Sequence, residues 1–291
     1  MRHYRKIKKA VFPIAGFGTR FLPITKSVPK EMLPIINKPL ISWALEEASS
    51  SGIEEFIFVV GSNTSLLKDY FSKWPALKQK LKKDNQTILL REINKIEKFL
   101  PKIKFVNQKS PLGLGHAIWC ARKIIGDDFF AVILPDDLIL AKNPCLKQMI
   151  AAHKRVGGNL VAVEKVPSDQ VNRYGILDPA FSKGNLIKVK RLVEKPKPKS
   201  SPSNLAIIGR YILSPAIFSF LGKKQKGVGG EIQITDAISS SLQKIAFHGF
   251  RFNGSRFDCG NEEGYLEASL AFSYNTSRKK KSLRKIIRKY L

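Results

Sequence analysis

Short apolar runs alternate with amphipathic segments through the first half of the chain. The apolar runs have the length of buried strands and lie at residues 9–14, 56–60, 103–107 and 129–134. The segments between them are helical in pattern and lie at residues 39–51, 63–71 and 117–125, with a charged, loosely helical excursion at 75–102. Because strands alternate with helices, this half predicts a parallel α/β sheet.

The second half reads differently, since its apolar runs follow one another with fewer helices between them. After a helix at 144–156 and the pair Gly157-Gly158, strands are predicted at 159–166, 174–177, 186–193 and 204–213, and a helix at 261–274. This pattern indicates a second half built mainly of mixed strands.

A polar, glycine-containing turn follows the first strand. Gly16 and Gly18 allow close backbone approach and a positive φ, and successive N–H groups in such a turn can form an anion-binding nest. Arg20 adds a charged fork suited to phosphate oxygens, and Lys30 a second cation. The P-loop pattern is missing, and Phe21 stands where the dinucleotide fingerprint needs its third glycine. The turn predicts a polyphosphate site, and an ordinary strand-to-loop turn is the alternative.

Two further strand ends carry candidate chemistry. Gln108 and Gly113 follow the third strand, and an amide with a nearby backbone group could read a base such as uracil. His116 is either a helix-start or supporting residue or a ligand-binding residue. Asp136 follows the strand at 129–134, where open α/β sheets bind ligands and a carboxylate can hold Mg²⁺. Asp137 is the less favoured of the pair, and a solvated strand end is the alternative.

Composition narrows the class of protein. The 291 residues are 43% hydrophobic, which suits a globular domain and argues against disorder. No apolar run is long enough to span a membrane, and no cleaved signal peptide is expected. Three scattered cysteines fit a reduced cytoplasmic protein without structural zinc, and Cys259 reads as a small buried residue.

The formal net charge of +28 is unusual. Nucleic-acid or membrane-surface binding would explain it, but most lysines are scattered, which favours a solvated surface around an enzyme with anionic substrates. Residues 276–291 form a basic amphipathic helix with eight Lys or Arg side chains. Docking on another subunit or on the protein body is expected, with anionic lipid and nucleic acid as alternatives.

Several segments together resemble sugar-1-phosphate nucleotidyltransferases over roughly residues 8–275. Residues 16–41, GFGTRFLPITKSVPKEMLPIINKPLI, resemble the family signature G-x-G-T-R-x-x-P-x-T, followed by P-K-E/Q-M-L-P and K-P. The residues found at these motif positions are most similar to those of bacterial UTP–glucose-1-phosphate uridylyltransferases. Glu194-Lys195-Pro196, NLAIIGRY at 204–211, EIQITD at 231–236 and RFDCG at 256–260 are similar to later family motifs.

The resemblance implies a single nucleotidyltransferase domain at 1–275, with a Rossmann-like mixed, mostly parallel central sheet flanked by helices. Its nucleotide-binding half would span about 8–157 and its sugar-binding half about 158–275. The reaction implied is Mg²⁺-dependent transfer of UMP from UTP to glucose 1-phosphate. The implied catalytic residues are Arg20, Lys30 and Lys195. The implied binding residues are Ala15, Gly16, Gly18, Thr19, Gln108 and Gly113 for the nucleotide, Gly175, Glu194, Lys195 and Glu231 for the sugar phosphate, and Asp136 and Asp258 for the metal.

Three alternatives stay open at this point. A thymidylyltransferase, or an enzyme for another sugar 1-phosphate, would share most of these residues. A nucleic-acid-binding protein on a degenerate enzyme fold is possible but not favoured, because the charged residues of the motifs are intact. The family is often dimeric or tetrameric, so a cytoplasmic homo-oligomer is expected.

Overall fold

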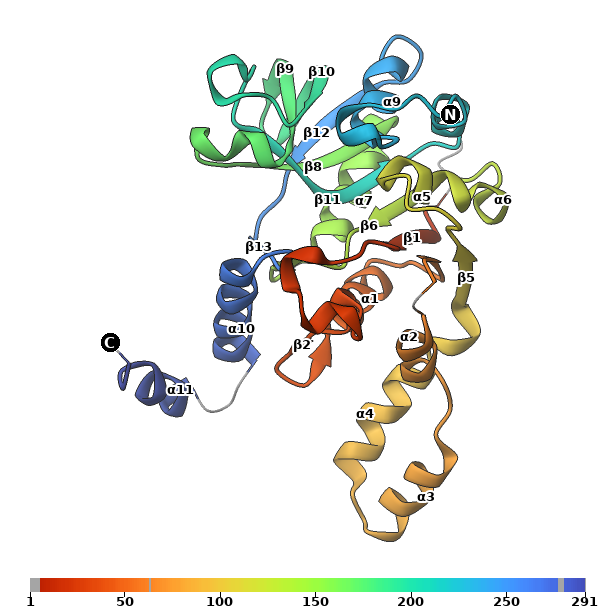
Figure 1. The fold of residues 1–291 in the computed structure, drawn as a ribbon, viewed down its shortest axis with the longest axis vertical. Coiled ribbons are helices and arrows are strands. Elements are labelled where there is room, and N and C mark those ends of the chain that lie inside the picture. The colour runs from red at the N-terminus through yellow and green to blue at the C-terminus, as the bar shows by residue number, and fades with distance from the viewer. Residues whose placement is uncertain (1–5, 63, 277–279, 291) are drawn as a thin grey trace.

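A nine-stranded sheet runs through the protein, which we describe from a computed structural model covering residues 6–62, 64–276 and 280–290 (Figure 1). The strand order is β5 (Ile103–Asn107), β4 (Glu55–Val60), β1 (Lys9–Ile14), β6 (Phe130–Ile133), β11 (Leu205–Leu213), β8 (Asn159–Lys165), β12 (Phe247–Arg251), β10 (Leu186–Glu194) and β9 (Gly175–Lys183). The predicted strands are therefore present, and all belong to one sheet.

Strand direction divides the sheet in two. β5, β4, β1 and β6 are mutually parallel, as the alternation of strands and helices predicts. β11 pairs antiparallel with β6 and β8, and β10 pairs antiparallel with β9 and β12, while β8 and β12 are parallel. The expected mixed α/β fold is confirmed, with its parallel character concentrated in the first half.

Helices cover both faces of the parallel half. Phe12 and Phe58 point to the face covered by α1 (Leu40–Ser50) and α7 (Cys145–Val156). Val11 and Ile57 point to the opposite face, which α5 (Leu114–Cys120) covers here and α9 (Ile234–Ser241) covers farther along, against β10. Successive strand residues alternate between faces, so an uninterrupted apolar run is needed when both are covered. Each such side chain stabilises the fold by roughly 1.5–3 kcal/mol.

A small second sheet lies beside the large one. β7 (Asp137–Leu140) pairs antiparallel with β13 (Ser255–Asp258), which places Asp258 opposite Asp137. Leu138, Phe257 and Phe272 form a buried cluster there, with α10 (Glu262–Thr276) packed over it. The sequence did not predict this sheet, because strands of four residues are too short to show a period. A third sheet joins β2 (Pro34–Ile35) and β3 (Lys38–Pro39).

The charged excursion is folded rather than irregular. α2 (Ser65–Tyr70) is followed by α3 (Pro75–Lys83) and α4 (Thr87–Glu97), which pack on each other and project from the body (Figure 1). The helix predicted at 117–125 starts earlier and is interrupted at Ala121, giving α5 and α6 (Arg122–Ile125). The sequence pattern did not predict α8 (Ile217–Leu221) or α9 (Ile234–Ser241), nor the strand β12 of the large sheet.

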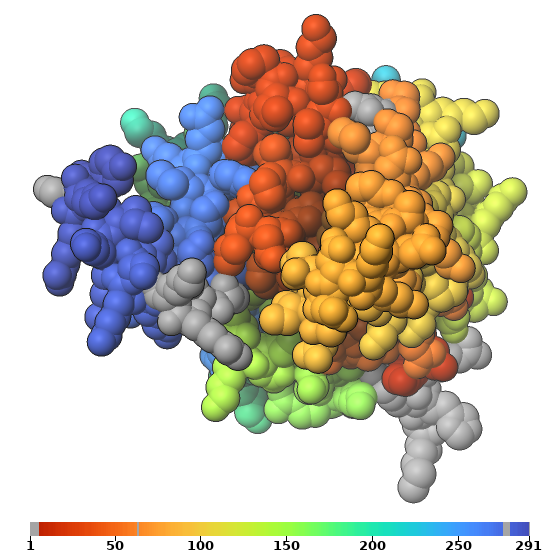
Figure 2. Space-filling model, turned by 90° about the horizontal axis from the view of Figure 1, so that it is seen from below, coloured from red at the N-terminus to blue at the C-terminus, as the bar shows by residue number. Residues whose placement is uncertain are grey.

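The basic C-terminal helix is present as α11 (Lys280–Ile287). Residues 277–279 and 291 of the predicted segment, like residue 63 of the predicted second helix, lie outside the described residues. α11 packs beside α10, where Arg284 Nη2 donates to Tyr274 Oη over 2.5 Å and Lys280 Nζ lies 4.9 Å from the Tyr274 ring centre. Ile286 is 53% exposed, so α11 keeps apolar surface in contact with solvent (Figure 2, dark blue).

Candidate active site

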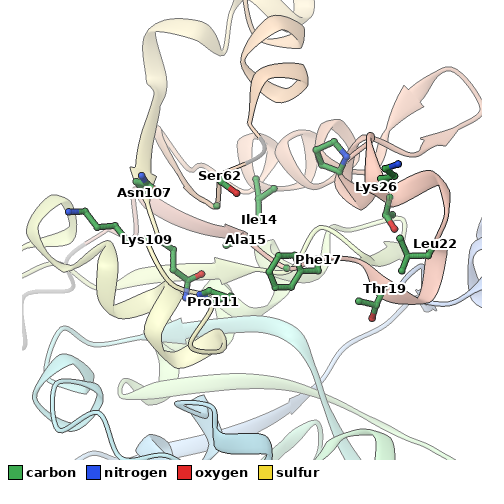
Figure 3. A pocket seen from close by; sticks show the side chains of 15 residues that line it. Ile14, Ala15, Phe17, Thr19, Leu22, Lys26, Ser62, Asn107, Lys109 and Pro111 are labelled. Carbon is green, nitrogen blue, oxygen red and sulfur yellow. The ribbon is translucent and has the colours of Figure 1, made fainter.

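Three adjoining cavities lie where β1, β5 and β6 end. The first measures about 600 Å³ and lies between the glycine turn after β1 and the end of β5 (Figure 3). It shares Ala15, Gly16 and Gln108 with a second cavity of about 360 Å³. The second shares Leu134 and Asp136 with a third of about 410 Å³. The cavities therefore form one continuous groove along the carboxyl edge of the parallel strands, where open α/β sheets bind ligands.

The glycine turn borders the first cavity. Gly18 has φ 63°, and its carbonyl accepts a hydrogen bond from Thr25 Oγ1 over 2.8 Å. A Cβ at Gly18 would lie 3.1 Å from the Thr25 side chain, so glycine suits both the conformation and the space. Phe17 and Thr19 face the cavity from one side, and Asn107 from the other (Figure 3).

Gln108 joins the first cavity to the second. Its backbone N–H donates to the Val60 carbonyl over 2.8 Å, which continues the line of β5, and its side chain is buried. Its Nε2 lies 3.3 Å from the Gly113 carbonyl and 2.9 Å from His116 Nδ1. His116 thus supports Gln108, which agrees with the first of its two sequence interpretations.

Gly113 and Glu231, assigned by the resemblance to nucleotide and sugar phosphate, touch each other. Gly113 has φ 98°, and a Cβ there would lie 2.7 Å from Glu231 Cβ. Both line the second cavity together with Gln108. The contact is held by the Ile232 backbone, which donates to Leu112 O and accepts from Gly115 N, each over 2.8 Å.

Lys30 forms an ion pair with Asp136 in the second cavity. Lys30 Nζ lies 2.5 Å from Asp136 Oδ2 and 4.0 Å from Glu31 Oε1. Burial opposes the charge on Lys30, but the two carboxylates outweigh it and raise the Lys30 pKa. Burial likewise opposes the charge on Asp136, but Lys30 outweighs it and holds the Asp136 pKa below its usual value. Burial raises the pKa of Glu31, which is 1% exposed, to about 7.

Arg20, Lys195 and the two predicted metal carboxylates line the third cavity. The Cys259 N–H donates to the Asp136 carbonyl over 2.7 Å, which fastens the end of β13 beside Asp136. A Cβ placed on Gly260 would lie 2.9 Å from Asp258 Oδ1, 3.3 Å from Asp136 Oδ2 and 3.4 Å from Arg20 Nη1. Residues more than one hundred positions apart in the chain therefore converge on one point.

The chemistry of these oxygen donors fits Mg²⁺. The ion is usually bound by one or two carboxylates together with substrate phosphates and water, rather than by a complete protein cage. Asp136 and Asp258 supply two carboxylates at one place. Within the described ranges, no group of three or more His, Cys, Asp or Glu residues could hold a metal, so the remaining ligands would have to come from substrate and water.

Arg256 and Asp137 form a buried pair that sequence reasoning missed. Arg256 Nε donates to Asp137 Oδ1 over 2.6 Å, and the Gly209 N–H donates to Asp137 Oδ2 over 2.7 Å. Both oxygens of Asp137 are thus engaged, which agrees with the preference for Asp136 as the metal carboxylate. Arg256 Nη1 also lies 3.3 Å from Tyr174 Oη, which donates to Asp258 Oδ2 over 3.4 Å. The motif RFDCG contained Arg256, but only the pairing of β13 with β7 reveals its partner.

The predicted sugar-side residues of β9 and β10 are neighbours. Gly175 pairs with Glu194 across the two strands, and a Cβ there would lie 2.7 Å from Thr235 Cγ2. Thr235 Oγ1 donates to Glu194 Oε2 over 2.9 Å, and Glu194 Oε1 lies 3.8 Å from Lys195 Nζ. Lys195 has φ 46°, an uncommon value for a residue with a side chain. The strand therefore ends in a fixed bend that brings Lys195 to the third cavity.

A second buried pair supports the loop that carries Asp136. Arg210 is fully buried on β11 and binds both carboxylate oxygens of Glu47 on α1, over 3.1 and 2.8 Å. Its Nη1 donates to the Leu134 carbonyl over 3.1 Å. Arg210 thus links the loop after β6 to α1.

The three cysteines differ in exposure, and all have free thiols. Cys145 and Cys259 are buried, Cys120 is half-buried, and none is in a disulfide. Burial, followed by Asp136 and its neighbouring carboxylates, raises the pKa of Cys259. Cys259 is therefore a protonated thiol, and its burial in the core confirms the prediction of a small buried residue.

Comparison with known proteins agrees with this geometry. The nucleotidyl transferase family model matches residues 9–273. The UTP–glucose-1-phosphate uridylyltransferase of Bacillus subtilis is 44% identical over 269 residues, 92% of each chain. A UDP-glucose pyrophosphorylase solved with UDP-glucose is 42% identical with a TM-score of 0.83, covering 93% of this chain and 100% of that one. A UTP-bound UGPase from Acinetobacter baumannii is 37% identical with a TM-score of 0.89, covering 97% and 99%.

The similarity extends over nearly the whole of each chain, and it includes every residue that lines the three cavities. The chain therefore belongs to the nucleotidyl transferase family and, within it, to the UTP–glucose-1-phosphate uridylyltransferases.

Proposed function

We propose that the protein transfers UMP from UTP to glucose 1-phosphate in a Mg²⁺-dependent reaction, giving UDP-glucose and pyrophosphate. One observation carries this proposal. Arg20, Asp136, Lys195 and Asp258 line one cavity, and that cavity joins the groove formed by the glycine turn and Gln108. The relatives named for this reaction, and the related structures with UTP or UDP-glucose, support it.

The chemistry needs positioning more than an activated side chain. The second pKa of a sugar phosphate is about 6, so its oxygen is already a dianionic nucleophile at neutral pH. Its approach to a polyanion is opposed by charge repulsion, and catalysis rests on alignment and charge neutralisation. No covalent enzyme intermediate is required.

Each cationic residue has a distinct task in this scheme. Arg20 and Lys30 hold the β- and γ-phosphates and stabilise the departing pyrophosphate. Lys195 holds the phosphate of glucose 1-phosphate at the third cavity. A Mg²⁺ ion on Asp136 and Asp258 would supply further neutralisation between the two substrates.

The neutral residues select and orient the substrates. Ala15, Gly16, Gly18 and Thr19 present backbone groups to the triphosphate, while Gln108 and Gly113 meet the base. Glu194 and Glu231 accept hydrogen bonds from sugar hydroxyls, and Gly175 leaves room beside Glu194.

Two related activities compete with this proposal, transfer of a thymidylyl group and use of another sugar 1-phosphate. The test is pyrophosphate release across a matrix of four NTPs, dTTP and several sugar 1-phosphates, with and without EDTA. We expect UTP with glucose 1-phosphate to give the highest kcat/KM, and EDTA to abolish turnover. A higher kcat/KM for dTTP or for another sugar would replace the proposal by the corresponding activity.

We also propose that the protein acts in the cytoplasm as a homo-oligomer. None of the helices within the described ranges has the length and hydropathy needed to cross a lipid bilayer. The exposed apolar surface of α11 supports docking on a second copy. Deleting residues 280–291 should then lower the mass measured by light scattering and leave kcat/KM unchanged. Unchanged mass, together with lost binding to DNA or to anionic vesicles, would assign α11 to an outside polyanion.

A further inference from the structure

Both amide hydrogens of Gln108 are engaged within the protein. One points to the Gly113 carbonyl oxygen at 3.3 Å and the other to His116 Nδ1 at 2.9 Å. An amide nitrogen can only donate, so Nδ1 has to accept with its lone pair. The His116 hydrogen is therefore on Nε2, which lies 3.9 Å from Cys120 Sγ.

The Gly113 carbonyl decides which way the amide faces. Rotating the amide by half a turn would bring Gln108 Oε1 against the Gly113 oxygen, and two acceptors repel each other. In the native orientation, Oε1 receives no hydrogen bond from any group in the described part of the chain. Gln108 lines both the first and the second cavity, so Oε1 is the atom it can offer to a ligand.

These two hydrogen bonds limit the ways in which Gln108 can recognise a base. The sequence suggested that the Gln108 amide reads a base such as uracil, but the two amide hydrogens are already used within the protein. An acceptor alone distinguishes bases by their ring nitrogen. Uracil and thymine carry a hydrogen on N3, whereas cytosine has a lone pair there and would be repelled.

We propose that His116 is a positioning residue that locks the Gln108 amide, so that Oε1 accepts a hydrogen bond from the ring N–H of the incoming base. The site thereby favours UTP and dTTP over CTP and does not distinguish UTP from dTTP at this atom. The inference rests on the proposed function and adds the origin of its selectivity for the base.

The surroundings of His116 suit an acceptor that stays neutral. The ring is buried on α5 and stacks on Trp119 with the ring centres 6.0 Å apart. Burial, followed by the charge of Lys224, lowers the His116 pKa, while the Ser110 carbonyl opposes this change. The imidazole is thus neutral at pH 7, and its lone pair remains available to Gln108.

Three substitutions at one position separate positioning from packing. His116→Asn keeps an acceptor oxygen on Cγ, where Nδ1 is attached. His116→Gln places its amide near the position of Nε2, toward Cys120, and His116→Phe keeps the ring but removes the acceptor. The measurements are kcat/KM for UTP and CTP, and Kd for both nucleotides by calorimetry.

We expect His116→Phe and His116→Gln to lower the UTP/CTP ratio of kcat/KM and of affinity by roughly tenfold, the effect of one hydrogen bond. His116→Asn should stay within about threefold of the native ratio. Equal losses for both nucleotides, with the ratio unchanged in His116→Phe, would overturn the inference and leave a packing role. Equal use of UTP and CTP by the native protein would instead contradict the proposed function.

Discussion

Lys30 Nζ lies 2.5 Å from Asp136 Oδ2, so the cation assigned to the triphosphate and the carboxylate assigned to the metal neutralise each other in the ligand-free protein. In the proposed reaction, Lys30 would exchange this partner for phosphate, and Asp136 would exchange it for the metal. This exchange would cost little net charge separation, because a divalent cation would replace the positive charge of Lys30 beside Asp136, and phosphates would replace the negative charge of Asp136 beside Lys30. The pair also keeps both groups charged although they are largely buried.

Because Lys30 pairs with Asp136, we expect removal of the Lys30 charge to weaken nucleotide binding and to strengthen metal binding. Lys30→Met should weaken UTP binding and lower kcat by about 10²–10³, the usual loss for one charge-stabilising donor. It should also tighten binding of Mn²⁺ to the nucleotide-free protein, because Asp136 loses its competing cation. Electron paramagnetic resonance of Mn²⁺ measures the second effect independently of turnover. Weaker Mn²⁺ binding would contradict the competition, and Asp136→Asn is the control that should remove metal binding.

Lys195 allows a test of the sugar-phosphate assignment. Lys195→Ala should raise KM for glucose 1-phosphate or lower kcat, with UTP affinity nearly unchanged, because its side chain lines the third cavity and not the two with Gln108. Lys190 is an exposed lysine on β10, the strand that ends just before Lys195, so Lys190→Ala is the matched control and should behave as native. Loss of UTP binding with normal use of the sugar phosphate would show that the assignment is wrong.

The raised pKa of Glu31 leads us to expect that the free energy of unfolding depends on pH. Its pKa is raised from 4.5 to about 7, so between those pH values the folded state binds more protons than the unfolded state. Stability contributed by this group therefore falls as pH rises through that window. Glu31→Gln lacks the titration, so its stability relative to native should increase between pH 5 and pH 8 by up to about 3 kcal/mol. Urea unfolding at both pH values measures this, with the exposed Glu262→Gln as control; a constant difference would argue against the raised pKa.

Among these variants, we expect the substitution of Arg210 to cause the largest loss of stability. Arg210→Met would remove the cation that pairs with Glu47, leaving the carboxylate only the Leu146 N–H among the described residues, and would free the Leu134 carbonyl, at a cost of about 3–5 kcal/mol. Arg191→Met, which breaks a surface pair with Asp178, should change stability by less than about 1 kcal/mol. Chemical denaturation of both variants compares the two positions directly. Similar losses in the two variants would mean that the buried pair adds nothing beyond a surface one.

Local pattern was enough to predict the elements that depend on local physics. In β4, EFIFVV, every residue after Glu55 is apolar because helices cover both faces of the sheet. A buried strand of this kind can be predicted from its sequence alone. The turn after β1 could also be predicted from sequence, since glycine adopts a positive φ readily and Gly18 has φ 63°. Asp136, at the end of a buried strand, falls where topology alone places a ligand-binding edge.

Only the tertiary structure decided which distant residues meet. The approach of Asp258 to Asp136 depends on the pairing of β13 with β7 and on the hydrogen bond from Cys259 to Asp136, contacts that join strands more than one hundred residues apart. The pairing of Lys30 with Asp136, and the locking of Gln108 by His116, likewise depend on side-chain directions that periodicity does not encode. The sequence by itself thus determined most strands of the large sheet, the glycine turn and the chemical types in the groove. Long-range packing decided their partners, because a hydrogen bond requires atoms within about 3 Å, a distance that only the assembled sheet can set.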